Sequence, residues 1–342
     1  MCRLALAVDP RYAGPLAGCS RHGRKRGGPI IPRAARQRVD GVLLLDKPPG
    51  LTSNAALQRV RRLFNAEKAG HTGTLDPLAS GLLPLCFGEA TKFARFLLDA
   101  DKRYRATVRF GVTTTTQDAE GDVVETRPVT VDRARLDAAL PAFIGPLRQT
   151  PPAYSALKYQ GRNYYEYARA GIDIPRPARD VRVDTLALTE WSCPDATFDV
   201  VCSKGTYVRA LAADLGAALG CGAHLRALRR IASGGFAVTD AVSLDALEAS
   251  SAESRNAWLL PVDCLLAELP RIDVDGDAAA RLADGRSIAA PELAADRFRA
   301  YDRAGRLLGV VRRAGAELAP ERMARTTKSE DVRGSDRIDC LP

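Results

Sequence analysis

GHTGTLDPLASG, residues 70–81, is the stretch of this chain that carries the most structural information. Three glycines and one proline surround a single carboxylate, Asp76, and this composition predicts a loop. Pro77 disfavours helical geometry at Asp76 and stiffens the turn. An aspartate in such a turn most often caps the backbone, and the sequence contains no GxxxxGKS or GxxxxGKT phosphate-binding motif. The loop alone therefore leaves a structural and a catalytic role open for Asp76.

On either side of this loop, some segments have apolar residues at helical spacing and others have them at strand spacing. Thr52 or Ser53 can cap a helix. From Lys102 the spacing changes to two, so Tyr104 faces inward at the mouth of a strand, where it either packs in the core or presents its ring to a ligand. The expected elements are a buried strand at 42–45, helices at about 53–64 and 90–98, strands at 102–110 and 198–202, and a helix at about 208–219.

Residues 149–180 form the longest stretch with little apolar periodicity, and a long loop with a short helix at about 164–170 is predicted there. From Arg148 to Arg182 the chain holds seven basic residues and three acidic ones, together with five tyrosines. Basic residues interleaved with aromatic ones suit contacts to phosphates and to stacked, unpaired bases. Beyond Leu269, short strands separated by turns predict a small β-rich module at about 268–320.

CSKGTYVRALAADLG, residues 202–216, reads as a strand end, a glycine turn and a helix start. Arg209 stands in the first turn of that helix, where a guanidinium opposes the helix dipole, and a partner carboxylate would explain it. The alternative is a solvated Arg209 beside a Tyr207 that packs on Leu211. Cys202 alternates with buried apolar residues, so it is expected to be a small core residue rather than a nucleophile.

The charge of the chain is concentrated at its N-terminus. Its 342 residues hold 50 Lys and Arg against 41 Asp and Glu, a net charge of +9. Residues 1–39 carry +8 of this, whereas residues 40–249 carry only +2. Segment 21–38, rich in Arg, Gly and Pro, predicts a disordered arm. This arm either adds salt-sensitive affinity for RNA or is dispensable.

Several classes of protein are disfavoured by the remaining composition. No apolar run approaches the roughly 20 residues of a membrane span, and Asp9 and Pro10 cut the first apolar run too short for a secretory signal. Eight cysteines are scattered without a CxxC pair, and there are three histidines. A metal site is therefore not expected. A cytoplasmic location, in which the thiols stay reduced, is expected instead.

Five motifs occur here in a familiar order: GVLLLDKPPGLTSN, AGHTGTLDPLASGLLPLCFGEATKF, DKRYRA, SALKYQGRNYYEYAR, and CSKGTYVRALAADLG followed by CGAHLRALRR. Together they closely resemble the TruB family of bacterial tRNA pseudouridine-55 synthases over about residues 40–265, and more loosely beyond. The resemblance implies the α+β pseudouridine synthase fold with a central, mostly antiparallel sheet. It also implies a domain plan: a basic disordered arm at 1–38, a catalytic domain at 39–265 with a thumb loop at about 149–180, a PUA-like RNA-binding module at 266–325, and a disordered tail at 326–342.

The same resemblance implies an activity on the T-arm of tRNA, in which a flipped-out uridine is detached from C1′, turned and rejoined through carbon. Asp76 would stabilise or attack the positive charge that develops on the sugar, with Arg209 as its ion-pair partner. Tyr104 would stack on the target base and Tyr207 would join the hydrogen bonds around it. The expected substrate-binding residues are His71, which fills the space left by flipped nucleotides, Leu228, which packs beneath the base, and Lys47, Tyr154, Lys158 and Arg169. No cofactor or metal is implied, and a monomer is expected.

One position departs from the family pattern. The family commonly shows Thr-Asp-Thr after the strand at 102–112, whereas this chain has Thr114-Thr115-Thr116. The missing acid usually contributes to an arginine–aspartate network, so Arg209 is expected to depend on Asp76 alone or on Asp118. A reduced or differently tuned rate is the expected consequence.

Two other functions compete with this interpretation. A non-catalytic RNA-binding protein could keep the scaffold, although it would tolerate loss of Asp76 and Tyr104, and both are present in full motif context. Hydrolysis of a nucleoside bond is disfavoured, because no second carboxylate is evident to activate water. The sequence does not decide between a covalent ester and a glycal intermediate, or whether RNAs other than tRNA are substrates.

Overall fold

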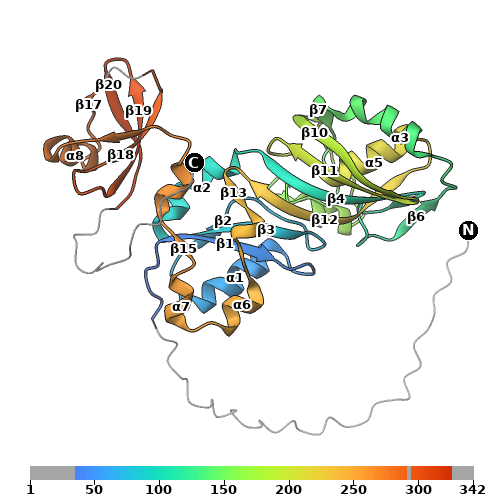
Figure 1. Ribbon diagram of the computed structural model, residues 1–342, viewed down its shortest axis with the longest axis horizontal. Coiled ribbons are helices and arrows are strands. Elements are labelled where there is room, and N and C mark those ends of the chain that lie inside the picture. Colours follow the sequence, from blue (N-terminus) through green and yellow to red (C-terminus); the bar gives the residue numbers. More distant parts are fainter. Residues whose placement is uncertain (1–34, 291–293, 326–342) are drawn as a thin grey trace, which may run out of the picture. The chain divides into compact units, whose positions relative to one another are not determined.

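The computed structural model describes residues 35–290 and 294–325, and an eleven-stranded sheet is its largest feature (Figure 1). The main path of this sheet runs through β14 (Val242–Ser243), β1 (Gly41–Lys47), β3 (Ser80–Phe87), β12 (Ala223–Ser233), β4 (Lys102–Phe110), β11 (Asp195–Cys202), β10 (Arg179–Ser192) and β7 (Gly145–Gln149). Three short strands pair beside this path: β2 (Ala69–His71) with β3, β13 (Phe236–Ala237) with β12, and β15 (Leu259–Leu260) with β1. All neighbours are antiparallel except β1 with β14 and β3 with β12, as the expected mostly antiparallel sheet requires.

One face of the sheet packs against helices. Helices α1 (Ser53–Leu63), α3 (Arg133–Ala139) and α5 (Val208–Ala218), with the 3-10 helix η2 (Leu140–Phe143), supply apolar residues to a core shared with β1, β3, β4 and β11. Period-two alternation in β4 turns Tyr104, Ala106 and Val108 into this core. Thr52 caps α1, since its side chain accepts a hydrogen bond from Ala55 N at 3.0 Å. The predicted strands and helices of this region are therefore confirmed.

The opposite face of β1 and β3 carries a second core. Its apolar residues come from η1 (Gly88–Lys92), α2 (Ala94–Leu98) and η4 (Val262–Leu266), together with Val310. The single helix expected at about 90–98 is wrong in detail, because a 3-10 turn and a short α-helix meet at Phe93, whose ring is fully buried in this core. The chain from β13 onward adds η3 (Val238–Asp240), α6 (Leu244–Ala249) and α7 (Ala252–Asn256).

The C-terminal part contains its own sheet, as predicted. Its strand order is β16 (Arg271–Asp273), β18 (Arg297–Tyr301), β19 (Leu307–Ala314), β20 (Glu317–Met323) and β17 (Ile288–Ala289). Helix α8 (Gly276–Ala283) packs on it through the buried Leu282. Phe298 and Val311 complete a small separate core.

Two hairpins project from the large sheet. One joins β5 (Val112–Thr114) to β6 (Val123–Thr126). The other, β8 (Lys158–Tyr159) with β9 (Arg162–Asn163), lies within the predicted thumb and was not expected. The short helix predicted in the thumb is confirmed as α4 (Tyr164–Arg169), whose start is stabilised by Glu166 Oε1 accepting from Asn163 N at 3.2 Å.

The predicted basic arm and tail fall mostly outside the described residues, which exclude 1–34 and 326–342. The end of the predicted arm is ordered, contrary to expectation: Gln37 bridges to Ala66, and its backbone N donates to Asn65 O at 2.8 Å. No helix in the described part of the chain is long and apolar enough to cross a membrane.

Candidate active site

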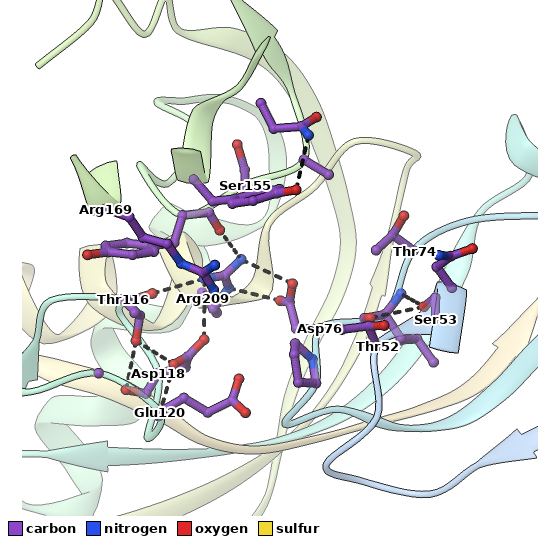
Figure 2. Close-up of a pocket in the computed structure, with 18 of the residues that line it drawn as sticks. Thr52, Ser53, Thr74, Asp76, Thr116, Asp118, Glu120, Ser155, Arg169 and Arg209 are labelled. Atoms are coloured by element: carbon purple, nitrogen blue, oxygen red, sulfur yellow. Dashed lines mark hydrogen bonds and ion pairs between the residues drawn. The ribbon is translucent and has the colours of Figure 1, made fainter. Parts of the chain in front are cut away.

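A cavity of about 900 Å³ opens beside Asp76. Four separate parts of the chain line it: the start of α1, the loop 71–77, the turn between β5 and β6, and the thumb. Arg209 of α5 reaches it from the sheet side, and Figure 2 shows the guanidinium lying between Asp76 and Asp118. The cavity is therefore assembled from segments that are far apart in the sequence.

The loop that carries Asp76 is held rigidly on both sides. Ser53, buried at the start of α1, donates through Oγ to Leu75 O at 3.0 Å and accepts from Leu75 N at 2.7 Å. Beyond Asp76, Pro77 O accepts from Gly50 N at 2.8 Å. The backbone of Asp76 is thus fixed by its two neighbours, which leaves its carboxylate free to face the cavity.

Lys47 binds the backbone of the same loop and is not among the described residues that line the cavity. Its ammonium group donates to Pro48 O at 2.8 Å and to Leu51 O at 2.7 Å, with Pro77 O at 3.5 Å. The side chain is fully buried, and burial lowers its pKa to about 8. Substrate binding by Lys47 stays a prediction, and in this structure its ammonium group is bound by loop carbonyl groups.

Arg209 joins three of the four segments that line the cavity. Its Nε lies 2.9 Å from Asp76 Oδ2, and Nη2 donates to Asp76 Oδ1 at 3.2 Å. Nη1 lies 3.3 Å from Asp118 Oδ2 and donates to Thr116 O at 3.0 Å, while Nη2 also donates to Tyr154 O at 2.9 Å. A planar guanidinium has the donors to make all of these contacts at once. The carboxylate partner expected for this arginine is present, and there are two of them.

The electrostatics of Asp76 combine two opposing effects. Burial raises the pKa of its carboxyl group above the ordinary value, and the nearby Asp118 adds to this, whereas Arg209 opposes the rise. The Arg209 side chain is 4% exposed and that of Asp76 is 34% exposed. The Asp76 carboxylate is therefore partly open to the cavity, whereas the Arg209 guanidinium is buried. A group bound in the cavity would thus meet the negative charge of Asp76.

The turn between β5 and β6 supplies the second acid. Asp118 is 2% exposed, and its Oδ1 accepts from Glu120 N at 3.0 Å. Thr115 also lines the cavity but is exposed, and its Oγ1 accepts from Asp122 N at 3.1 Å. The second of the two sequence alternatives holds, because Arg209 contacts Asp118 as well as Asp76. The reduced rate expected from Thr115 thus loses its structural reason.

Thr115→Asp tests this point. Because Asp118 already provides the acid, we expect the single-turnover rate of uridine conversion in a tRNA transcript to change by less than about threefold. Thr115→Ser is the matched control, since it keeps the hydroxyl acceptor. A rate gain of tenfold or more for Thr115→Asp alone would show that the missing acid does limit the expected reaction.

The thumb contributes an aromatic and a basic residue to the cavity. Tyr165 and the exposed Arg169 both line it, with the Arg169 guanidinium 5.4 Å from the Tyr165 ring centroid. Tyr154 lines it as well and is fixed through its carbonyl by Arg209. Lys158 lies on β8, exposed and away from the lining.

Three predicted residues are not among the described residues that line the cavity. Tyr104 is 9% exposed within the main core, and burial raises the pKa of its phenol. Tyr207 is half-buried, and burial raises its pKa too, with Asp76 adding to the effect. Leu228 is 8% exposed on β12, opposite Ala106. Stacking on Tyr104 therefore stays a prediction that requires its ring to become accessible.

His71 is part of the cavity lining, and its contact with displaced nucleotides stays a prediction. It lines the cavity from the end of β2, and burial together with the charge of Arg230 lowers its pKa. Both effects favour the neutral form of the imidazole.

Some residues that shape the site were not found from the sequence. The sequence indicates Ser53 only as a possible helix cap. Its hydrogen bonds to Leu75 in the Asp76 loop leave at most a weak sequence signal, a hydroxyl near a glycine-rich loop. Arg230 is 1% exposed and donates to Leu82 O at 2.7 Å and to Gly73 O at 3.2 Å, which ties β12 to the Asp76 loop. A fully buried arginine in the motif CGAHLRALRR has no local sequence signature.

This arrangement can stabilise a positive charge on a substrate next to Asp76. It also allows the Asp76 carboxylate to attack an electrophilic carbon of that substrate. Across residues 35–290 and 294–325, no three His, Cys, Asp or Glu side chains group closely enough to hold a metal ion. The site offers the partly exposed Asp76 carboxylate held by an enclosed guanidinium, the further carboxylates of Glu120 and Asp122 on the β5–β6 turn, and tyrosines from the thumb. Such a set suits a substrate with a developing cationic centre and a planar, polar ring.

Comparison with known proteins agrees with this geometry. The profile described as "TruB family pseudouridylate synthase (N terminal domain)" matches residues 61–208, and "tRNA pseudouridylate synthase B C-terminal domain" matches 209–267. A tRNA pseudouridine synthase B from Burkholderia mallei (strain ATCC 23344) is 56% identical over 302 residues, which cover 86% of this chain and 97% of the relative. One from Thiobacillus denitrificans (strain ATCC 25259 / T1) is 57% identical over 300 residues, covering 87% and 100%.

Solved structures share the fold. A chain in "Crystal Structure of a Cbf5-Nop10-Gar1 Complex" is 27% identical with a TM-score of 0.64, covering 83% of this chain and 84% of that one. A chain in "Structure of H/ACA RNP bound to a substrate RNA containing 2'-deoxyuridine" is 25% identical with a TM-score of 0.63, covering 84% and 85%. The predicted pseudouridine synthase fold is therefore confirmed.

Proposed function

Since the chain belongs to the TruB family of pseudouridine synthases, we propose that it modifies uridine 55 in the T-loop of tRNAs. It is a tRNA pseudouridine synthase and converts uridine to pseudouridine in tRNA. The position within the tRNA and the chemical steps are the parts that we propose. The observation that carries them is the partly exposed Asp76 carboxylate, held by the enclosed Arg209 at the wall of the cavity.

The proposed reaction is an isomerisation in which no atom is gained or lost overall. The bond between N1 of uracil and C1′ breaks, and the electron pair leaves with the base. Asp76 either stabilises the positive charge at C1′ without bonding to it, or attacks that carbon to form an ester, which breaks and returns its electron pair to the carboxylate when C5 bonds to C1′. The base then turns, C5 bonds to C1′, the proton on C5 departs and N1 gains one. A single carboxylate is sufficient for this sequence, and no water is consumed in it.

Access of a uridine to Asp76 requires that the nucleotide leave its stack. Asp76 lies inside a cavity rather than on an open surface, so we propose that the target base flips out of the T-arm and enters the cavity. His71 and Tyr165 line the cavity and supply ring faces or edges for contact with displaced bases. Tyr104, Tyr207 and Leu228 would surround the base once the site closes on it.

Recognition of the RNA is assigned to two segments. We propose that the thumb, residues 149–180, closes on the T-loop, with Lys158 and Arg169 exposed for phosphate contacts. The module at 266–325 is the proposed second RNA contact of the PUA-like type. We propose that the protein acts as a monomer. A cytoplasmic location follows from the substrate.

The proposal is tested by treating an unmodified tRNA transcript with the purified protein and mapping pseudouridine at single-nucleotide resolution. Pseudouridine at position 55, and its loss from a transcript with cytidine at that position, is the expected result. Pseudouridine elsewhere in the tRNA would refute the assigned position. The same mapping in cells that lack the protein identifies any further RNA substrates.

A further inference from the structure

Gln149 stands at the root of the thumb. It is the last residue of β7, and it pairs with Arg179, the first residue of β10, so the two residues close the base of the loop between them. Although polar, Gln149 is only 3% exposed. A buried amide needs hydrogen-bond partners, and the partners of Gln149 reveal what it holds.

Both ends of the Gln149 amide bind the backbone of a single residue, Tyr207. Its Oε1 accepts from Tyr207 N at 3.0 Å, and its Nε2 donates to Tyr207 O at 3.4 Å. Tyr207 is the N-cap of α5 and adopts extended geometry. The side chain of Gln149 therefore pairs with Tyr207 as the backbone of a neighbouring strand would.

The pairing of Gln149 with Tyr207 lies next to the helical turn that sets the direction of the Arg209 side chain. Arg209 is the second residue of α5, two positions after Tyr207, and its direction depends on the position of the first helical turn. Arg209 in turn donates to Tyr154 O at 2.9 Å, five residues beyond Gln149 along the thumb. The start of α5 and the first residues of the thumb are thus joined twice: once by Gln149 with Tyr207, and once by Arg209 with Tyr154.

We propose that Gln149 is a positioning residue for this reaction: it fixes the start of α5, so that Arg209 holds Asp76 in its active orientation, and it couples this to the root of the thumb. The inference rests on the proposed roles of Asp76 and Arg209. Gln149 itself does not line the cavity described here, so it acts through Arg209 and not by contact with RNA. A displacement of the thumb root would therefore also displace the arginine that contacts both acids.

Gln149→Met is the decisive variant, because it keeps the length of the side chain and removes both hydrogen bonds. We expect the single-turnover rate at saturating enzyme to fall about 10- to 100-fold, the range that small misplacements of catalytic groups produce. The dissociation constant for tRNA should change by less than about threefold, since uniform binding is unaffected. Gln58→Met is the matched control: it makes the same chemical change on α1, outside the cavity lining, and should keep the wild-type rate.

A second measurement separates positioning from mere stabilisation. If Gln149 acts through Arg209, Gln149→Met should lower the rate much less in an Arg209→Lys background than in the wild type, whereas a purely structural effect would be additive. If Gln149→Met fails to fold, Gln149→Glu replaces it, because it keeps the acceptor for Tyr207 N, and a rate loss with tRNA binding retained is again expected.

The outcomes distinguish the two proposals. A wild-type protein that forms no pseudouridine at position 55 would overturn the proposed function. An active wild type together with a Gln149→Met or Gln149→Glu variant of unchanged rate, or with additive effects in the double variant, would overturn the role of Gln149.

Discussion

Asp76→Asn is expected to reduce pseudouridine formation at least about 10⁴-fold, the range seen when an essential catalytic side chain is removed. An amide of the same shape neither carries the negative charge that stabilises a cationic sugar nor attacks its C1′. Arg209 would keep its ion pair with Asp118, so the walls of the cavity should stay in place. The measurement is single-turnover conversion of a tRNA transcript, with enzyme in excess.

The affinity for tRNA decides between catalysis and simple RNA binding. The Asp76→Asn variant should bind tRNA within about threefold of the wild type, because the substitution affects the transition state rather than the ground state. Asp137→Asn is the matched control; this residue pairs with Arg133 on the surface of α3 and should keep full activity. Conversion that persists in Asp76→Asn would remove the catalytic assignment and leave the RNA-binding alternative standing.

The sequence predicted the local elements wherever apolar periodicity was clean. The alternation in residues 102–110 and the helical spacing after Thr52 both matched the structure, because each element buries one face only. Strand β3 was not predicted. Its sequence, SGLLPLCF, is apolar throughout and buried on both faces, so no alternation marks it. The two-residue strands of the thumb are too short to leave any pattern.

The candidate site was predictable to the extent that it lies within motifs. Asp76 and Arg209 were expected as partners, and the structure brings them within ion-pair distance. Their common contact with Asp118 was left open by the sequence, because the turn that carries it is placed by tertiary contacts. The burial of Lys47 could not be predicted for a related reason: a lysine beside a loop is usually solvated, and its burial against three carbonyl groups depends on how two distant loops meet.

Arg209→Met is expected to lower the free energy of unfolding by about 3–5 kcal/mol, the usual effect of removing one partner of a buried ion pair. Asp118, whose side chain is 3% exposed, would be left without its cation. Asp118→Asn in the same background removes the unpaired charge and should recover a large part of this loss without restoring activity. Urea unfolding of the two variants measures this. Equal stability of Arg209→Met and the wild type would show that the network does not hold the site together.

The pH dependence of the residual activity provides the sharper test of what Arg209 does for Asp76. Asp76 acts in its ionised form, so the rate rises with pH through the pKa of its carboxyl group, which burial has already raised above the ordinary value. Arg209 is the main influence that lowers this pKa. Its replacement by methionine should therefore raise the pKa further and move the acid limb of the single-turnover profile to higher pH, relative to the wild type. A limb that stays in place would mean that another group controls it, and that Arg209 serves to orient Asp76 rather than to keep it ionised.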